Sequence, residues 1–158
     1  MKKRLAGLRA KRNGAIAEQV LSDTAKAVPA LIYKRYEPYK RVSKGGGKTF
    51  RAVYTEKSGC DYSIFLPDGR AGMIEVKSRQ TRINKSAIDE TQHHQLLDLL
   101  SMGHLAYVLI FIEGEWVLVN YYKFISGPRK SYTLAQLLEI GVPLTVENGI
   151  LINLLEHL

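Results

Sequence analysis

The segment from residue 59 to 77 constrains the fold of this chain more than any other. It contains two runs of strand-forming residues separated by Pro67-Asp68-Gly69, a combination typical of a tight turn. Asp61 lies seven residues before Asp68, and Glu75 lies seven residues after it. A hairpin centred on Asp68 therefore places the two carboxylates opposite each other on adjacent strands.

Such a hairpin brings like charges together, because cross-strand neighbours have Cβ atoms roughly 4.5–5.5 Å apart. A divalent cation such as Mg²⁺, which prefers carboxylate oxygens, would compensate for this repulsion. Lys77 shares a strand face with Glu75, since residues two apart point the same way, whereas Val76 points towards the core. The hairpin is therefore predicted to present Asp61, Glu75 and Lys77 in one place.

The composition is that of a globular protein with an anionic partner. The 158 residues are long enough for one domain with a hydrophobic core. The net charge of +8 indicates that the partner is nucleic acid or an anionic membrane surface. The single cysteine, Cys60, excludes an intrachain disulfide and fits a reducing compartment.

No segment is predicted to enter a membrane. The longest apolar run, residues 105–112, is far shorter than the roughly 20 residues that a transmembrane helix needs. The basic N-terminal residues are not followed by an apolar core of signal-peptide length. We therefore expect a soluble cytoplasmic protein that does not associate with membranes.

The hydrophobic pattern predicts an α/β fold with a mixed central β-sheet flanked by helices. Residues 1–12, with six basic residues and no acid, are predicted to form a mobile arm before a single domain over residues 13–158. The expected helices cover residues 15–27, 87–102 and 133–140. The expected strands cover residues 31–36, the two arms of the hairpin, residues 105–112 and residues 115–122, and a further short apolar element follows Val142.

Residues 37–57 are predicted to project from this domain as a basic hairpin or loop. Aromatic residues alternate with lysines and arginines here, and three glycines at positions 45–47 interrupt the segment. The sequence Gly47-Lys48-Thr49 resembles the end of a phosphate-binding P-loop, but the position that requires the first glycine is Val42. We therefore expect no nucleotide cofactor.

These features together resemble the PD-(D/E)xK nuclease pattern, which combines a carboxylate on a first helix, an Asp strand, a Glu-x-Lys strand and a following helix. Within that superfamily the chain most resembles the RecU-type Holliday junction resolvases, over roughly residues 13–124. A basic projection also lies at the place of residues 37–57 in RecU-like proteins. The matching parts are Gly14-Ala15-Ile16-Ala17-Glu18, Asp61-Tyr62, Glu75-Val76-Lys77, His94-Gln95 and the strand at residues 107–111. Cys60 replaces the superfamily's proline, and Gly59 replaces a threonine of the RecU pattern.

The resemblance implies a restriction-endonuclease-like fold and a homodimeric endonuclease that depends on Mg²⁺, with Mn²⁺ as the alternative metal. Such an enzyme resolves Holliday junctions by paired nicks during DNA recombination and repair, so the expected partner is four-way junction DNA. The resemblance also implies that Glu18, Asp61 and Glu75 surround the metal and that Lys77 is catalytic.

The chemistry of phosphodiester hydrolysis suits these residue types. A bound metal lowers the pKa of its water and polarises the phosphate. Lys77 would orient or activate that water and offset the developing charge. Zinc is not expected, because no pair of histidines has metal-site spacing with a third ligand.

The predicted DNA-binding residues combine positive charge with aromatic rings. Lysine and arginine neutralise phosphates, and aromatic rings stack on unpaired bases. Gln95, on the helix after the catalytic strand, is expected to support Lys77 or to contact the DNA backbone. The full set is Tyr36, Tyr39, Lys40, Arg41, Lys44, Lys48, Arg51, Arg79, Arg82 and Gln95.

Two other functions remain open at this stage. The chain fits another PD-(D/E)xK DNA nuclease, of restriction or repair type. It also fits a basic nucleic-acid-binding protein without catalysis, in which Glu75 and Lys77 form a surface pair and Glu18 is an ordinary helix-surface residue. That last function leaves the register of Asp61 and Glu75 unexplained.

Overall fold

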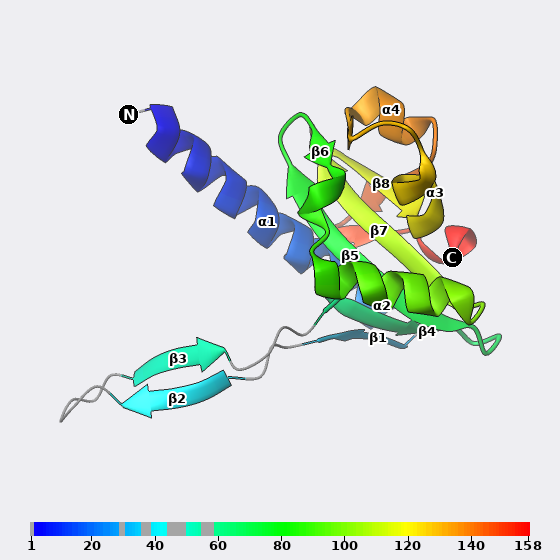
Figure 1. Cartoon of the computed structure of the whole chain (residues 1–158), viewed down its shortest axis with the longest axis horizontal. Helices are drawn as coiled ribbons and strands as arrows, with labels where there is room; N and C mark the ends of the chain where they lie inside the picture. Colours follow the sequence, from blue (N-terminus) through cyan, green and yellow to red (C-terminus); the bar gives the residue numbers. More distant parts are fainter. Residues whose placement is uncertain (1, 29–30, 36–38, 44–49, 55–58) are drawn as a thin grey trace.

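The computed structural model describes the backbone of residues 2–28, 31–35, 39–43, 50–54 and 59–158, and the side chains of residues 13–28, 32, 34–35 and 59–158. A six-stranded sheet lies at its centre (Figure 1). Its central neighbours β5 and β7 are parallel, and the other neighbouring pairs are antiparallel. Across the sheet the order is β1 (Leu31–Lys34), β4 (Tyr62–Phe65), β5 (Ala71–Arg79), β7 (Leu105–Ile112), β8 (Glu115–Asn120) and β10 (Val142–Leu144).

The β4–β5 hairpin has the register that the sequence predicts. Tyr62 pairs with Ile74, so the pairing is centred on Asp68. In the turn, the Asp68 carboxylate accepts a hydrogen bond of 3.0 Å from the backbone N–H of Arg70. Gly69 follows with a φ of 88°, a backbone conformation that glycine adopts without strain. The local turn chemistry therefore fixes which residues of the two strands face each other.

Helix α2 (Glu90–Ser101) makes the crossover between the parallel strands β5 and β7. Asp89 caps it, because its carboxylate accepts from the backbone N–H of Gln92 while the Gln92 carboxamide oxygen accepts from the N–H of Asp89. The predicted helix start at residue 87 is too early, since the preceding residues form a 3₁₀ turn, η1 (Lys85–Ala87).

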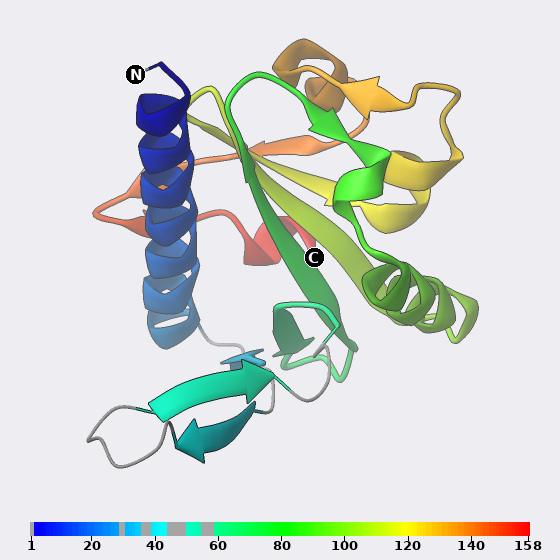
Figure 2. The ribbon, with the colours of Figure 1, turned by 60° about the vertical axis from the view of Figure 1, so that its left-hand side comes forward.

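Helices cover both faces of the sheet (Figure 2). Helix α1 (Lys2–Ala27) lies on one face, where Leu21 belongs to the same core cluster as Leu109. Helix α2 lies on the other face, where Leu96 belongs to a second cluster with Val108. Because successive strand residues point to opposite faces, β7 contributes to both clusters, and its side chains separate the two cores.

Helix α1 begins at Lys2, so the prediction of a helix start near residue 15 is wrong. Residues 2–12 are the first part of this helix. Lys, Arg, Leu and Ala dominate this stretch and are strong helix formers, and no proline interrupts it. The Asn13-Gly14 pair, which precedes the predicted start, lies inside the helix.

Strand β8 ends at Asn120, and a short helix, α3 (Tyr121–Ser126), follows where the sequence predicts continued strand to residue 122. The Asn120 side chain accepts a hydrogen bond of 3.0 Å from the backbone N–H of Tyr122 and caps this helix. Tyr121 and Phe124 are fully buried on the α2 side of the sheet. Helix α3 therefore completes the second core.

A small unit follows α3 on the same side of the sheet. Strand β9 (Ser131–Tyr132) pairs with β6 (Ile83–Asn84), which follows β5 in the chain. Helix α4 (Leu134–Leu138) is capped by Thr133, and Gln136 completes the capping box.

The C-terminal residues close the core beneath α1. Strand β10 pairs with the edge of β8, and β11 (Val146–Glu147) pairs with β12 (Ile150–Leu151), before the 3₁₀ turn η2 (Leu155–His157). The hydroxyl of Thr24 on α1 accepts a hydrogen bond of 2.9 Å from the backbone N–H of Leu151. In the described part of the chain, the structure contains no helix with the length and apolar character needed to span a membrane.

The basic segment at residues 37–57 contains a separate hairpin, as the sequence predicts. Strand β2 (Tyr39–Ser43) pairs with β3 (Phe50–Tyr54), and Figure 1 shows this hairpin extending away from the central sheet. Residues 44–49, predicted to be a flexible tip, lie outside the described residues. The first predicted strand is shorter than expected, since β1 ends at Lys34.

Candidate active site

The two carboxylates that the sequence places across the hairpin do meet there. Asp61 lies one step before the paired residues Tyr62 and Ile74, which puts it opposite Glu75 in the same register. The backbone N–H of Asp61 donates to Glu75 Oε2 at 3.1 Å, and the N–H of Val76 donates to Asp61 Oδ2 at 3.0 Å. Each carboxylate is thus oriented by the backbone of the opposite strand.

Lys77 joins this pair from the same face of β5. Its ammonium nitrogen lies 2.5 Å from Glu75 Oε1, and it also donates to Gln92 Oε1 at 3.2 Å. The Glu75 side chain is 1% exposed and that of Lys77 is 15% exposed. The structure therefore brings Asp61, Glu75 and Lys77 into a single, largely buried cluster.

Gln92, which the sequence analysis did not select, connects helix α2 to this cluster. Its Nε2 atom donates to Glu75 Oε1 at 2.8 Å and to the Gly59 carbonyl oxygen at 3.4 Å. Its Oε1 atom accepts from Lys77 and from the N–H of Asp89 at the start of α2. Gln92 thus takes the supporting position beside Lys77 that the sequence analysis considered for Gln95.

Gln95 instead holds the chain just before Asp61. Its Oε1 atom accepts from the backbone N–H of Cys60 at 3.1 Å and from Arg35 Nη1 at 3.3 Å. A Cβ atom at Gly59 would lie 2.0 Å from that same oxygen, and Gly59 has a φ of 77°. A glycine at position 59 is therefore required by this backbone path and by the position of Gln95.

The electrostatics of the cluster disfavour two ionised carboxylates. Burial raises the pKa of Glu75 to about 7, and the charge of Asp61 adds to this shift while Lys77 opposes it. Burial also raises the pKa of Asp61, although the hydrogen bond from Val76 and the charge of Lys77 oppose the change. A bound cation would favour the ionised form of both acids.

Cys60 does not act as a nucleophile in this setting. Its side chain is fully buried, and burial together with the charges of Glu75 and Asp61 raises the pKa of its thiol to about 12. A thiol of that pKa carries almost no thiolate at neutral pH. Cys60 packs with Leu96 and Val108 in the core beneath α2.

Glu18 lies at the edge of the cluster. Its side chain is 61% exposed, and its carboxylate pairs with the Lys34 ammonium at 2.7 Å. Its negative charge nevertheless contributes to the raised pKa of Asp61, which places it near enough to act on that carboxylate. Its role as a metal ligand remains a prediction.

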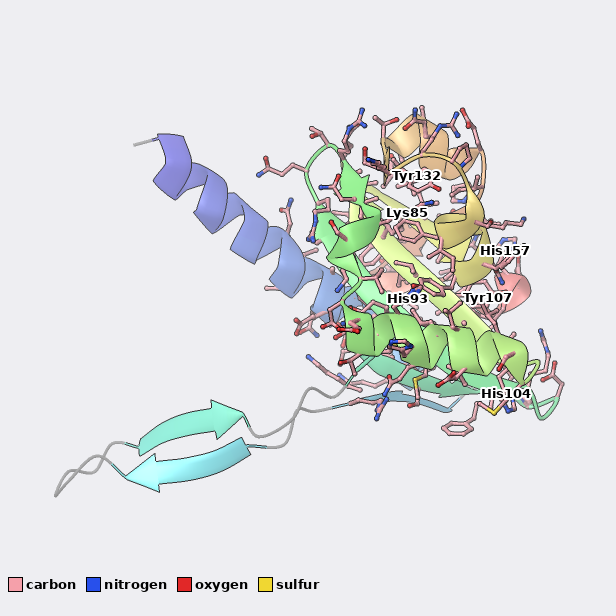
Figure 3. The ribbon with its side chains drawn as sticks, viewed as in Figure 1. Lys85, His93, His104, Tyr107, Tyr132 and His157 are labelled. Carbon is pink, nitrogen blue, oxygen red and sulfur yellow. The ribbon has the colours of Figure 1, made fainter. Side chains whose placement is uncertain are left out.

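The two histidines on α2 differ in their surroundings. His93 Nδ1 shares a hydrogen bond with the hydroxyl of Tyr121 on α3, so it links the two helices; Figure 3 labels it beside α2. His94 is exposed, with its Nε2 atom 3.9 Å from Glu90. Neither residue touches the carboxylate cluster in the described contacts.

The predicted DNA-binding residues lie on several different elements of the fold. Arg79 ends β5, and Arg82 donates to Ser131 Oγ at 2.7 Å; both are exposed. Tyr36, Lys44 and Lys48 lie outside the described residues. Tyr39, Lys40 and Arg41 are on β2 and Arg51 is on β3 of the projecting hairpin, where the structure describes the backbone.

Comparison with known proteins supports the architecture. No family model and no curated protein sequence matches the chain. Among solved structures, Hjc from Archaeoglobus fulgidus, a Holliday junction resolvase from an archaeal hyperthermophile, matches with a TM-score of 0.51. The fold of this chain is similar to that of Hjc. The match covers 80% of this chain and 93% of the Hjc chain at 14% sequence identity.

The likeness to Hjc confirms the predicted fold class, a mixed central sheet flanked by helices. Because one fold can carry many functions, the function has to be argued from the site itself. The RecU-type assignment, the metal and the dimer remain predictions.

The raised pKa of Glu75 predicts a pH-dependent stability. The folded protein binds the Glu75 proton more tightly than the unfolded chain does. Ionisation of Glu75 therefore lowers the free energy of unfolding as the pH rises, with no effect below pH 4.5 and the full effect above pH 7. Glu75→Gln removes this ionisation. We expect the stability of the variant, relative to the natural protein, to rise by about 3 kcal/mol between these two pH values.

Urea unfolding in EDTA at a series of pH values measures this difference. Glu115→Gln, at an exposed position on β8, is the control and should show no such trend. A stability difference between Glu75→Gln and the natural protein that stays constant with pH would contradict the raised pKa.

Proposed function

We propose that this chain is a metal-dependent, structure-selective DNA endonuclease that resolves Holliday junctions by paired nicks. The observation that carries the proposal is the buried cluster of Asp61, Glu75 and Lys77 on the β4–β5 hairpin. This hairpin belongs to a fold similar to that of a Holliday junction resolvase. The net charge of +8 suits a DNA substrate.

The donor set fits a hard divalent cation such as Mg²⁺, with Mn²⁺ as the alternative. Mg²⁺ is commonly bound through one or two carboxylates, water molecules and substrate phosphates. Asp61 and Glu75 would supply the carboxylates, and Glu18 is the further candidate. Within the described residues, no group of three or more His, Cys, Asp and Glu side chains is arranged to hold a metal ion. Water and phosphate oxygens would therefore complete the coordination.

When bound, the metal would lower the pKa of a water molecule and polarise the phosphate. Lys77 supplies the complementary positive charge. Its ammonium is fixed by Glu75 and Gln92, so it can offset charge on the phosphate without first being reoriented. The site is largely buried, and the low local dielectric strengthens this interaction.

The carboxylates of Glu75 and Asp61 differ in burial and in the number of contacts that hold them. The Glu75 carboxylate is buried and contacts the N–H of Asp61, the Lys77 ammonium and the Gln92 side chain. These three contacts fix its position on β5. Asp61 receives a hydrogen bond from Val76 and is less enclosed. Asp61 therefore offers the more accessible carboxylate, and Glu75 holds the cluster together.

Paired nicks require two active sites, because each cluster serves one phosphodiester at a time. We propose a homodimer with two-fold symmetry, which is the commonest arrangement of homo-oligomers and matches two related strands of a junction. Within the resolvases we propose the RecU type. The basic hairpin β2–β3 lies between β1 and β4 in the chain, at the place of the RecU projection.

The projecting hairpin would contact the junction DNA. Lys40 and Arg41 of β2 and Arg51 of β3 carry positive charge, and Tyr39 adds an aromatic ring. Such residues bind phosphates and stack on unpaired bases without reading a sequence. A surface of this composition supports selection of a DNA shape rather than of a short duplex sequence.

The first prediction from this proposal concerns the two carboxylates. Asp61→Asn and Glu75→Gln should each abolish Mg²⁺-dependent cleavage of a four-way junction, because each removes a metal ligand. Junction binding should stay within several-fold of the natural protein, since DNA affinity depends on the basic residues. Cleavage is followed on a labelled junction, and binding is measured separately in EDTA.

Asp98→Asn and Glu115→Gln are matched controls, because both acids are exposed and lie outside the cluster. They should cleave normally. Normal cleavage by the Asp61 and Glu75 variants would show that the cluster is not the catalytic centre.

A second prediction concerns Gln92. Gln92→Met removes the hydrogen bonds to Glu75 and Lys77, and we expect a roughly 10- to 100-fold loss of Mg²⁺ affinity or cleavage rate, as for other residues that orient metal ligands. Gln136→Met is the control, because Gln136 completes the same kind of capping box on α4 without contacting the cluster. Mg²⁺ titration and single-turnover cleavage provide the measurements. Equal losses in both variants would assign the effect to helix capping alone.

A further inference from the structure

A basic groove lies beyond the carboxylate cluster, on the α2 side of the sheet. It has a volume of about 540 Å³ and is lined by residues 84–86 and 128–131. The two segments are joined by the pairing of β6 with β9, in which Asn84 lies opposite Ser131. Their side chains come from parts of the chain more than 40 residues apart, so the groove exists only in the folded protein.

The groove is lined by three cationic side chains, two hydroxyls and no carboxylate. The cations are Lys85, Arg129 and Lys130, and the hydroxyls belong to Ser86 and Ser131. This composition is complementary to a phosphate group, which accepts hydrogen bonds and carries negative charge.

The cations of the groove differ in how they are already engaged. Lys85 donates to the carbonyl oxygens of Ile125 and Gly127, both at 2.6 Å, and Arg129 pairs with Glu139 at 2.9 Å. Lys130 is exposed, and in the described part of the chain no carboxylate lies within ion-pair distance of it. Lys130 is therefore the cation best placed to meet an external anion.

Several hydrogen bonds fix the walls of the groove. The backbone N–H of Lys85 donates to the carbonyl oxygen of Lys130 at 3.0 Å. Arg82 Nη1 donates to Ser131 Oγ at 2.7 Å, and the Tyr132 hydroxyl donates to the carbonyl oxygen of Phe124 at 2.9 Å. Because these contacts exist before any ligand binds, the walls of the groove need no rearrangement on binding.

The groove continues the path of strand β5 away from the active site. Glu75, Lys77 and Arg79 share one face of the strand, and Arg79 lies about 7 Å beyond Lys77 along it. The chain then enters β6 at the groove wall. In Figure 3, Lys85 lies between His93 on α2 and Tyr132 of β9, on the same side of the sheet. A DNA strand seated at Lys77 would therefore run towards the groove.

We propose that this groove binds a backbone phosphate of the DNA substrate outside the scissile position, with Lys130 as its main contact. The inference rests on the proposed function, because it gives the DNA strand a second fixed point beside the catalytic cluster. A phosphate contact of this kind carries no sequence information and sets the position of the strand.

Salt-dependent binding tests the proposal. Lys130→Ala and the double variant Arg129→Ala/Lys130→Ala are compared with the natural protein in EDTA, using a four-way junction at several salt concentrations. Loss of one phosphate contact should weaken junction affinity severalfold and reduce the slope of log affinity against log salt by about 1.

The matched control is Lys123→Ala, which removes one exposed lysine of α3 that lies outside the groove and lines a different pocket. It should keep the natural salt slope. Equal slopes for the Lys130 and Lys123 variants, in a protein that binds and cuts junctions, would overturn the groove and leave the proposed function intact. A protein that binds junctions with the expected Lys130 effect but never cuts would support the groove and overturn the nuclease. Absence of any DNA binding would overturn both.

Discussion

The hydrogen-bonded contact between Asp61 and Glu75 is the constraint on which the rest of this structure depends. Two acidic residues on adjacent strands repel each other, and the fold holds them together through backbone N–H groups of the opposite strand. Lys77 supplies the nearest compensating charge. Holding a carboxylate as buried as Glu75 costs stability at neutral pH, which is the pattern expected where function rather than stability selects a residue.

The surroundings of the cluster serve to keep it in place. Gln92 ties α2 to Glu75, and Gln95 ties the same helix to the backbone of Cys60. The two glutamines therefore fix the chain just before Asp61 and the Glu75 carboxylate opposite it. This arrangement allows only glycine at position 59, because the left-handed backbone and the nearby Gln95 carboxamide exclude a side chain.

Much of the fold and the centre of the site could be predicted from the sequence, because the signals there are local. The Pro67-Asp68-Gly69 turn and the period of two along each strand define the register that pairs Asp61 with Glu75. The apolar run at residues 105–112 coincides with β7. In these segments the turn residues and the pattern of buried side chains favour the same structure, so the local sequence is enough to predict it.

The sequence predictions are wrong or incomplete where a long-range contact overrides the local pattern, or where a single side chain determines which element forms. The apolar pattern of β8 continues into Tyr121, and only the capping side chain of Asn120 marks the change to helix. The Asp89-x-x-Gln92 capping box is visible in the sequence and could have located the start of α2, yet the contact of Gln92 with Glu75 requires the folded crossover. The groove between residues 84–86 and 128–131 joins distant segments and has no local signal.

The central claim is that the cluster hydrolyses junction DNA with the help of a divalent metal. The most direct test incubates the pure natural protein with a labelled four-way junction and with the matching duplex, in Mg²⁺ and in EDTA. We expect paired nicks on opposed strands of the junction, in Mg²⁺ alone, with the duplex left intact. Failure to cut either substrate in Mg²⁺ or Mn²⁺, by a protein that still binds the junction, would contradict it.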